Sequence, residues 1–195
     1  MPSSQNKIII ITAPSGAGKT SITHCLLTKM PQLAFSVSAA TRKPRADEKN
    51  GVDYYFISIN KFQQKIKEDA FVEWEMVYEG KYYGTLKSEL ERIWNKNKTP
   101  VLDIDVHGAI HVQKQYPENS LAIFIEPPSE AELKKRLESR GTESPESLQT
   151  RWNKAAYEMS FKYHFNKIIM NDEFPKACAQ TETEVSKFLG IKADG

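Results

Sequence analysis

A loop of small residues that ends in a lysine and a threonine lies between an apolar run and an amphipathic stretch. Its residues are Ala13, Pro14, Ser15, Gly16, Ala17, Gly18, Lys19 and Thr20. In such a loop the backbone N–H groups and the helix N-terminus surround a phosphate, the lysine reaches the β- and γ-phosphates, and the threonine hydroxyl can ligate Mg²⁺. The pattern normally opens with glycine, and alanine stands there in this chain. We therefore predict a nucleoside triphosphate site that departs from the P-loop pattern at one position.

The segments on both sides of the loop favour this interpretation over an ordinary glycine-rich turn. The run Ile8–Thr12 is rich in β-branched residues and predicts a buried strand. After the loop, Ile22, Leu26 and Met30 recur at helical spacing, and Pro31 ends the helix. The loop thus joins a strand to a helix N-terminus, which is the context that phosphate binding requires.

Arginine is rare in this chain, and most of it falls in two segments. Only six of the 27 basic residues are arginines, and five of these are Arg42, Arg45, Arg136, Arg140 and Arg151. A planar guanidinium binds phosphate through two parallel hydrogen bonds and stays charged, so each segment is predicted to grip a phosphate. Ion pairing with Glu132 and Glu138 on a helix surface is the alternative.

Strand-like runs alternate with helical ones along most of the chain. They are Ile8–Thr12, Ala34–Ser38, Val101–Asp105, Leu121–Ile125 and Lys167–Asn171. This order predicts the α/β class, with a parallel sheet flanked by helices. Asp103 and Asp105 share one face of the third run, so both carboxylates are expected at the carboxyl edge of the sheet, where open α/β folds bind ligands. Capping of the following helix is the alternative role for them.

Two stretches interrupt the alternation. The short strands Tyr54–Ile57 and Phe71–Val77, separated by the helix-like run Lys61–Asp69, predict a small α+β insertion over residues 38–90. In the second stretch, residues 129–159, Ser129 and Glu132 have the spacing of a capping box, and a second helix start follows Gly141. We expect two short helices there, which form a lid.

Composition and charge limit the possible partners and location. The net charge of +2 is too small to indicate nucleic acid or an anionic membrane surface as a partner. No apolar run approaches the length of a membrane span, and residues 1–6 do not resemble a signal peptide, so a cytoplasmic protein is expected. Cys25 and Cys178 fall within predicted helices, which favours two reduced, packed thiols over a disulfide.

The polar loop after Ala40 carries a longer and more specific motif. The stretch ATRKPRADEKNGVDYYF at residues 40–56 resembles the guanylate kinase signature T-[ST]-R-x-x-[KR]-x-x-[DE]-x-x-G-x-x-Y-x-[FY]. Every defined position matches except the first, where Ala40 replaces threonine. Similarity continues through further short motifs, among them FVEW at 71–74, KYYGT at 81–85 and VLDID at 101–105, and it extends from about Lys7 to Leu189.

The resemblance implies a guanylate kinase-like domain over residues 5–189, with polar tails at 1–4 and 190–195. Its core would comprise residues 5–37, 91–128 and 160–189, the insertion would bind GMP, and the lid would close over the substrates. The implied activity is transfer of the γ-phosphate of ATP to GMP, which forms ADP and GDP, with Mg²⁺ as the cofactor and without a protein nucleophile. A monomer or a homodimer is expected, with ATP and GMP as the small-molecule partners.

The resemblance also assigns roles to individual residues. The implied GMP site comprises Ser38, Arg42, Arg45, Tyr54, Glu73, Tyr83, Thr85 and Asp105. The charge of the moving phosphoryl group would be neutralised by Lys19, Arg45, Arg140 and Arg151, while Arg136, Asn171 and Asp172 would lie on the ATP side with the P-loop residues Ala13 to Thr20. Thr20, and Asp103 through a water molecule, would hold the metal.

Chemistry supports a carboxylate as the reader of the base. Guanine offers its N1–H and its 2-amino group side by side, and one carboxylate accepts from both, whereas adenine lacks this pair of donors. Glu73 alternates with apolar neighbours on its strand, but Glu75 shares its face and is the alternative reader. A solvent-exposed strand carboxylate is a further possibility.

Two other functions compete with this hypothesis. A scaffold module of the same family would keep the fold, bind proteins and lose phosphate-gripping residues, whereas this chain keeps Gly16, Gly18, Lys19 and Thr20. A related kinase acting on another phosphorylated compound would not need Glu73 or the signature loop.

Overall fold

The computed structural model describes residues 6–45, 47–138 and 145–191. Its centre is a five-stranded, all-parallel sheet with the strand order β2-β7-β1-β8-β9. The strands are β1 (Ile8–Thr12), β2 (Leu33–Phe35), β7 (Thr99–Asp103), β8 (Ser120–Glu126) and β9 (Lys167–Met170). The predicted parallel α/β sheet is therefore confirmed.

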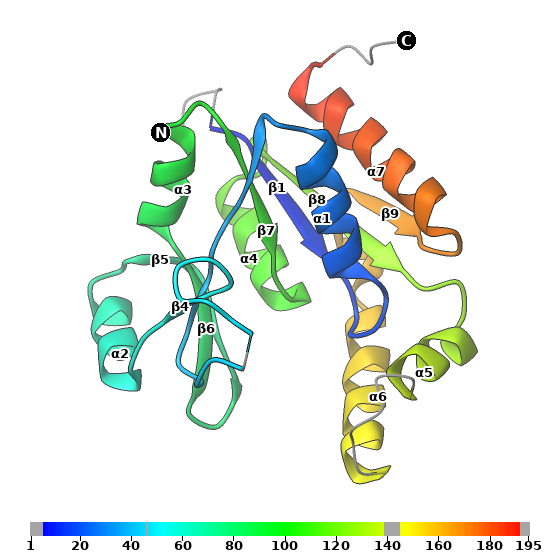
Figure 1. Cartoon of the computed structure of the whole chain (residues 1–195), viewed down its shortest axis with the longest axis horizontal. Helices are drawn as coiled ribbons and strands as arrows, with labels where there is room; N and C mark the ends of the chain where they lie inside the picture. The colour runs from blue at the N-terminus through cyan, green and yellow to red at the C-terminus, as the bar shows by residue number, and fades with distance from the viewer. Residues whose placement is uncertain (1–5, 46, 139–144, 192–195) are drawn as a thin grey trace.

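Helices cover both faces of this sheet because the central strand is apolar on both sides. Every residue of β1 is buried, and its isoleucines alternate between two core clusters. Ile9 and Ile11 pack with α1 (Lys19–Lys29) and α7 (Phe174–Leu189), whereas Ile8 and Ile10 pack toward α3 (Lys87–Trp94) and α4 (Val106–Gln115). Figure 1 shows the arrowheads of the central strands pointing toward the space between the insertion and helices α5 and α6.

The insertion forms a second sheet of its own. Its strand order is β4-β3-β6-β5, and α2 (Ile59–Lys67) packs beside it. The strands are β3 (Ala39–Ala40), β4 (Tyr55–Phe56), β5 (Phe71–Tyr78) and β6 (Lys81–Leu86). Sequence reasoning missed β6, which pairs antiparallel with β5. It also predicted a strand over Ala34–Ser38, whereas β2 ends at Phe35 and the next strand, β3, begins at Ala39.

The β5 strand departs from simple alternation near its start. Phe71, Val72 and Glu73 are all buried, and Trp74 is 46% exposed, so Val72 and Trp74 do not form the shared apolar side that the sequence suggested. The cause is a register irregularity between Phe71 and Glu73 in the pairing of β5 with β6. Glu73 consequently points into the protein although it follows two buried apolar residues.

A buried carboxylate ties the insertion to the core. Glu89 of α3 accepts hydrogen bonds from the Val37 backbone N–H at 3.0 Å, from the Tyr55 hydroxyl at 2.9 Å and from the Arg92 guanidinium. These partners come from the segment before the insertion, from β4 and from α3 itself. The hydrogen bonds therefore orient the second sheet with respect to the first.

Two helices form the predicted lid region. They are α5 (Glu130–Glu138) and α6 (Pro145–Met159), followed by the 3₁₀ turn η1 (Lys162–His164). The Glu132 backbone N–H donates to the Ser129 hydroxyl at 3.1 Å, which confirms the cap predicted there. Leu133 and Leu137 of α5 pack on Ala155 of α6. The connection between them, including Arg140 and Gly141, lies outside the described residues.

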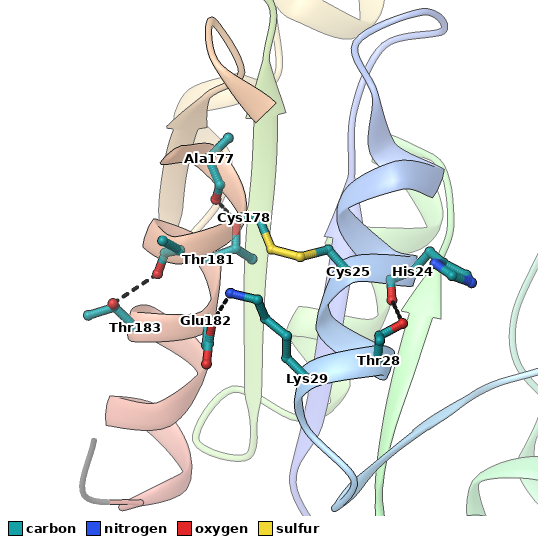
Figure 2. The surroundings of a disulfide bond; sticks show 10 residues. His24, Cys25, Thr28, Lys29, Ala177, Cys178, Thr181, Glu182 and Thr183 are labelled. Atoms are coloured by element: carbon teal, nitrogen blue, oxygen red, sulfur yellow. Dashed lines mark hydrogen bonds and ion pairs between the residues drawn. A yellow bond between two sulfur atoms is a disulfide. The ribbon is translucent and has the colours of Figure 1, made fainter. Parts of the chain in front are cut away.

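The prediction of two reduced thiols is wrong in this structure. Cys25 of α1 and Cys178 of α7 form a disulfide with a Cα–Cα distance of 6.4 Å, and Figure 2 shows it bridging the two helices near the ion pair between Lys29 and Glu182. The two cysteines are 153 residues apart in sequence, and they meet because α1 and α7 pack side by side. Their proximity depends on helix packing, which sequence spacing does not reveal.

The C-terminal tail was predicted over 190–195, but Gly190 and Ile191 close the end of α7 through backbone hydrogen bonds to Lys187 and Ser186. Residues 1–4 and 192–195 of the two predicted tails lie outside the described residues. Among the described helices, none has both the length and the apolar character needed to span a bilayer.

Candidate active site

One cavity of about 400 Å³ lies at the carboxyl ends of the sheet strands. Its walls come from the P-loop, the insertion, the segment after β7 and helix α6. The lining includes Ala13, Pro14, Ser15, Gly16, Gly18, Lys19, Thr20, Ser38, Tyr54, Glu73, Glu75, Tyr83, Asp103, Asp105, Arg151, Lys154 and Glu158. Most residues predicted for the two substrates therefore meet around one space, although they come from segments far apart in the sequence.

The loop between β1 and α1 has the backbone that the P-loop prediction requires. Gly18 has a φ of 96°, and a Cβ atom there would lie 2.3 Å from Nδ2 of Asn171, so no other residue fits without rearrangement. Ala13 replaces the first glycine of the pattern without strain, because it does not adopt a positive φ. The departure from the pattern therefore leaves the loop conformation intact.

Lys19 lies at the centre of the charged groups. Its Nζ is 2.5 Å from Oδ1 of Asp103 and 3.2 Å from the carbonyl oxygen of Ile104. Burial alone would lower the pKa of Lys19, but the adjacent carboxylates of Asp103 and Asp105 raise it above the ordinary value. The lysine is thus held as a cation beside the P-loop.

Glu73 is a buried carboxyl that also lines the cavity. It is 7% exposed, and the Thr85 hydroxyl donates to its Oε1 at 2.6 Å across the β5–β6 pair. Burial raises its pKa to about 7, and nearby Asp105 adds to the rise while the hydrogen bonds from Thr85 oppose it. Donors from a ligand would therefore favour the ionised form of Glu73.

Asp105 and Glu75 lie next to Glu73. Asp105 caps α4, since the Gly108 backbone N–H donates to its Oδ1 at 2.8 Å, and it also lines the cavity. The alternative role considered for Asp105, capping of the following helix, is thus correct. Asp105 can still contact a ligand, because it also lines the cavity. Asp103, by contrast, forms an ion pair with Lys19, so the two carboxylates have different hydrogen-bonding partners. The pKa of Glu75 is raised by its hydrogen bond with Asp105 and by burial.

Arg42 and two tyrosines form a cluster in the insertion. The Arg42 guanidinium lies 4.9 Å from the Tyr54 ring centre, and the Tyr54 and Tyr83 rings meet edge to face with their centres 5.9 Å apart. Glu48 grips the guanidinium with both carboxylate oxygens, and this hydrogen bonding lowers the pKa of Glu48 to about 2. Arg45 is exposed and is not part of the cavity lining in this structure. Of Arg42 and Arg45, the insertion thus orients only Arg42 toward the tyrosines in this structure.

Helix α6 brings three polar residues to the cavity, of which sequence reasoning identified one. The Arg151 guanidinium donates to the Ser15 hydroxyl at 3.3 Å. Glu158 is buried and accepts from the Ser15 backbone N–H at 3.3 Å, and Lys154 lies 3.8 Å from Glu158. Burial raises the pKa of Glu158, and Lys154 opposes this rise. The spacing of 151, 154 and 158 places all three on one helix face, and this pattern was the signal available in the sequence.

A second, more open pocket adjoins the outer side of the P-loop. Gly16, Gly18, Ser21, Arg136, Asn171, Asp172 and Phe174 line it. Arg136 pairs with Glu132, as the alternative interpretation held, but its Nη2 also donates to the Asn171 carbonyl at 3.2 Å. Nδ2 of Asn171 donates to the Ala17 carbonyl at 2.8 Å. Three of the residues predicted for the ATP side, Arg136, Asn171 and Asp172, therefore line one pocket together with Gly16 and Gly18 of the P-loop.

Oxygen ligands for a magnesium ion are present but few. Thr20 is an exposed hydroxyl at the start of α1, and Asp103 lies beside Lys19. In the part of the chain that the structure describes, no three His, Cys, Asp or Glu side chains gather as a metal site. This donor set fits Mg²⁺ as it occurs in kinases, held by one or two protein oxygens together with substrate phosphates.

Comparisons with known proteins agree with this geometry. The family model described as guanylate kinase matches residues 5–187. The chain is 44% identical over 188 residues to a guanylate kinase of Bacteroides fragilis, covering 96% of this chain and 92% of that protein. It is 45% identical over 184 residues to one of Porphyromonas gingivalis, covering 94% and 98% of the two chains.

A solved structure supports the same assignment. The crystal structure of guanylate kinase from Anaplasma phagocytophilum superposes with a TM-score of 0.75 at 26% identity, covering 93% of this chain and 85% of that one. The match covers nearly the full length of the chain. The P-loop and the buried Glu73 of the insertion meet in one cavity. This chain belongs to the guanylate kinase family.

Proposed function

We propose that the cavity binds GMP on the side of the insertion and the phosphates of ATP on the side of the P-loop. The chain transfers the γ-phosphate of ATP to GMP and forms ADP and GDP. The observation that carries the proposal is the pairing, across one cavity, of a phosphate-binding loop with a buried carboxylate suited to guanine. Nothing in the described residues favours the scaffold module or another phosphate acceptor.

On the GMP side, we assign the phosphate to the cluster of Arg42, Tyr54 and Tyr83, with Arg45 joining it from the exposed loop. Arg42 is already oriented by Glu48, so little side-chain entropy is lost on binding. We assign the base to Glu73, Thr85, Ser38 and Asp105. An ionised Glu73 would accept from the guanine N1–H and 2-amino groups, which adenine cannot donate.

On the ATP side, we assign the phosphates to the loop from Ala13 to Thr20 and the adenine to the pocket of Arg136, Asn171 and Asp172. A phosphate would compete with Asp103 for the Lys19 ammonium. When bound, Mg²⁺ neutralises phosphate charge, and Thr20, with Asp103 through water, would hold it.

The chemical step needs positioning and charge neutralisation more than acid–base help. An oxygen of the GMP phosphate attacks the γ-phosphorus while the bond from that phosphorus to the β–γ bridging oxygen breaks. Charge spreads over the equatorial oxygens of the moving group. Lys19, Arg45, Arg151 and the lid residue Arg140 would stabilise it, and closure of the lid would exclude water.

The substrate assignment is tested with the purified protein and a coupled assay of ADP release. With ATP and Mg²⁺, we expect turnover with GMP and dGMP and little with AMP, CMP or UMP, because only guanine presents two adjacent donors to Glu73. Comparable rates with GMP and AMP would contradict the assignment of the base. No turnover with any nucleotide would contradict the enzymatic function.

The division of labour between the arginines can be tested by substitution. Arg42→Ala is expected to raise the KM for GMP by about 10- to 100-fold, because a charge-assisted contact to the bound phosphate is lost. Arg151→Ala is expected to lower kcat by about 100-fold with a small change in the KM for GMP, because its charge acts on the transferring group. Arg140→Ala should resemble Arg151→Ala.

Lys43→Ala is the matched control for these variants, since Lys43 is an exposed cation in the same loop as Arg42. It should leave both constants near those of the parent. Equal effects of Arg42→Ala and Arg151→Ala on the KM for GMP, with kcat unchanged, would contradict the division.

The setting of the reaction is also a proposal. We infer that the chain acts in the cytoplasm, where ATP and GMP are available, as a monomer or homodimer. The small net charge of +2 speaks against nucleic acid or a membrane surface as a partner. In a reducing cytoplasm, external dithiols or glutathione would reduce the disulfide between Cys25 and Cys178 to two thiols and would themselves be oxidised to a disulfide.

A further inference from the structure

Helix α6 contacts the P-loop at Ser15 through two side chains. The Ser15 backbone N–H donates to Oε2 of Glu158 at 3.3 Å, and the Arg151 guanidinium donates to the Ser15 hydroxyl at 3.3 Å. All three residues line the cavity. Arg151 is assigned above to the moving phosphoryl group, whereas Glu158 has no role in that assignment. A carboxyl group beside a phosphate-binding loop needs an explanation, because its charge would repel the substrate.

Glu158 belongs to the end of α6 that is fixed on the core. It is 5% exposed, and Nζ of Lys154, one turn earlier on the helix, lies 3.8 Å from its Oε1. Just after it, Met159 and Phe161 pack against the core cluster on the α4 side of the sheet. The Phe161 ring centre lies 5.0 Å from that of His107 on α4. Packing on both sides therefore holds Glu158 in place.

Contacts that do not involve Glu158 hold the P-loop conformation. The Ala17 N–H donates to the Pro14 carbonyl at 3.1 Å, and Nδ2 of Asn171 donates to the Ala17 carbonyl at 2.8 Å. The first N–H groups of α1, which begins at Lys19, have no acceptor within the helix and can bind phosphate. The bond from Ser15 to Glu158 leaves these donors to ATP. Its loss would therefore loosen α6 rather than the loop.

The position of Glu158 determines where Arg151 lies. Arg151 precedes Glu158 by almost two helical turns, about 10 Å along the same face of α6. When Arg151 turns from the Ser15 hydroxyl to a phosphoryl group, the contact of Glu158 can persist and keep α6 aligned with the loop. Alignment matters because a misplacement of about 1 Å can lower a rate strongly.

We propose that Glu158 is a positioning residue for phosphoryl transfer, which accepts from the Ser15 N–H, anchors α6 to the P-loop and so aligns Arg151 with the transferring group. Glu158 acts through Arg151 and touches neither substrate. This inference rests on the proposed roles of the P-loop and of Arg151.

Two other roles for Glu158 would give different results. As an ion-pair partner it would act through its charge on Lys154, although 3.8 Å is too long for a hydrogen bond. As an occupant of the phosphate site it would compete with ATP, so its removal would lower the KM for ATP. The anchor alone requires an acceptor that reaches Ser15, whatever its charge.

Two variants of the full chain separate reach from charge. Glu158→Gln keeps an acceptor oxygen at the same reach without the charge, whereas Glu158→Asp keeps the charge on a side chain one methylene shorter. Glu158→Met removes both and keeps the length, and Glu130→Met is the matched control at an exposed glutamate of α5. The measurements are kcat and the KM values for ATP and GMP, at a temperature at which melting curves show each variant folded.

We expect Glu158→Gln to keep kcat within about threefold of the parent, and Glu158→Asp and Glu158→Met to lower it about tenfold or more. The KM values for both substrates should stay within about threefold. In an Arg151→Ala background, Glu158→Asp should lower kcat by less than about a further twofold, because both changes act on one contact. A merely structural loss would persist in that background.

Four results would overturn the proposal. These are a loss in Glu158→Gln at least as large as in Glu158→Asp, a parental kcat in Glu158→Met, a lowered KM for ATP in Glu158→Met, or an undiminished effect in the Arg151→Ala background. Arg151→Ala alone identifies the cause of failure. If it keeps parental turnover, the proposed role of Arg151 fails and the anchor with it. If it loses turnover while Glu158→Met does not, only the role of Glu158 fails.

Discussion

Lys19→Ala is expected to lower kcat about a thousandfold or more while the protein stays folded. In the structure the Lys19 ammonium is held at the P-loop by Asp103 and the Ile104 carbonyl, from where it can reach a phosphate. A single cation aimed at charge that develops in the transition state commonly contributes several kcal/mol. The variant also leaves Asp103 without its cation. The unpaired Asp103 carboxylate would then repel the ATP phosphates.

The measurement is steady-state turnover with ATP and GMP, combined with circular dichroism and a melting curve. Lys29→Ala is the matched control, since Lys29 lies on the same helix but forms its ion pair with Glu182 on the far surface. Near-normal turnover in Lys19→Ala, with an unchanged spectrum, would contradict the assignment of this loop to ATP.

Glu73→Gln is expected to lose GMP activity by about a hundredfold to a thousandfold in kcat/KM and to gain little with AMP. The amide can accept only one of the two guanine donors and turns its own N–H group against the other. A site built from buried hydrogen bonds rejects such a mismatch strongly, because desolvated polar groups are left unpaired. The KM for ATP should not change, which separates base recognition from damage to the P-loop.

The pH dependence of kcat/KM for GMP provides a second test of Glu73. The pKa of Glu73 is raised to about 7, mainly by burial, and GMP binding needs the ionised form. Below pH 7 each unit should therefore lower kcat/KM for GMP about tenfold through this group. The loss should disappear in Glu73→Gln. If Glu75→Gln abolished GMP turnover and Glu73→Gln did not, the base-reading carboxylate would be the other residue.

The raised pKa of Glu73 also affects the stability of the fold. Through this group, stability should be higher at low pH, whereas GMP activity should be higher at high pH. Because its pKa is higher in the folded chain than in the unfolded one, the folded state binds more protons between the ordinary value of 4.5 and about 7. The contribution of Glu73 to the free energy of unfolding is therefore present at low pH and is lost as the pH rises through 7. Glu73→Gln should be less sensitive to pH in this range.

The sequence by itself determined the phosphate-binding loop, the parallel sheet and the family resemblance. These features depend on local signals. The run of isoleucines in β1 can be satisfied only inside a sheet covered on both faces, and the loop before Lys19 needs glycines where φ is positive. The signature loop places Arg42 and Glu48 six residues apart, so their ion pair too is local.

The tertiary structure decided what depends on segments distant in sequence. It separated Asp103 from Asp105, giving the first to Lys19 and the second to the insertion, although sequence reasoning could not tell them apart. It brought Glu158 onto Ser15, Glu75 onto Asp105 and Cys25 onto Cys178. Such contacts arise when whole helices and sheets pack, and neither residue of the pair carries a local signal for its partner.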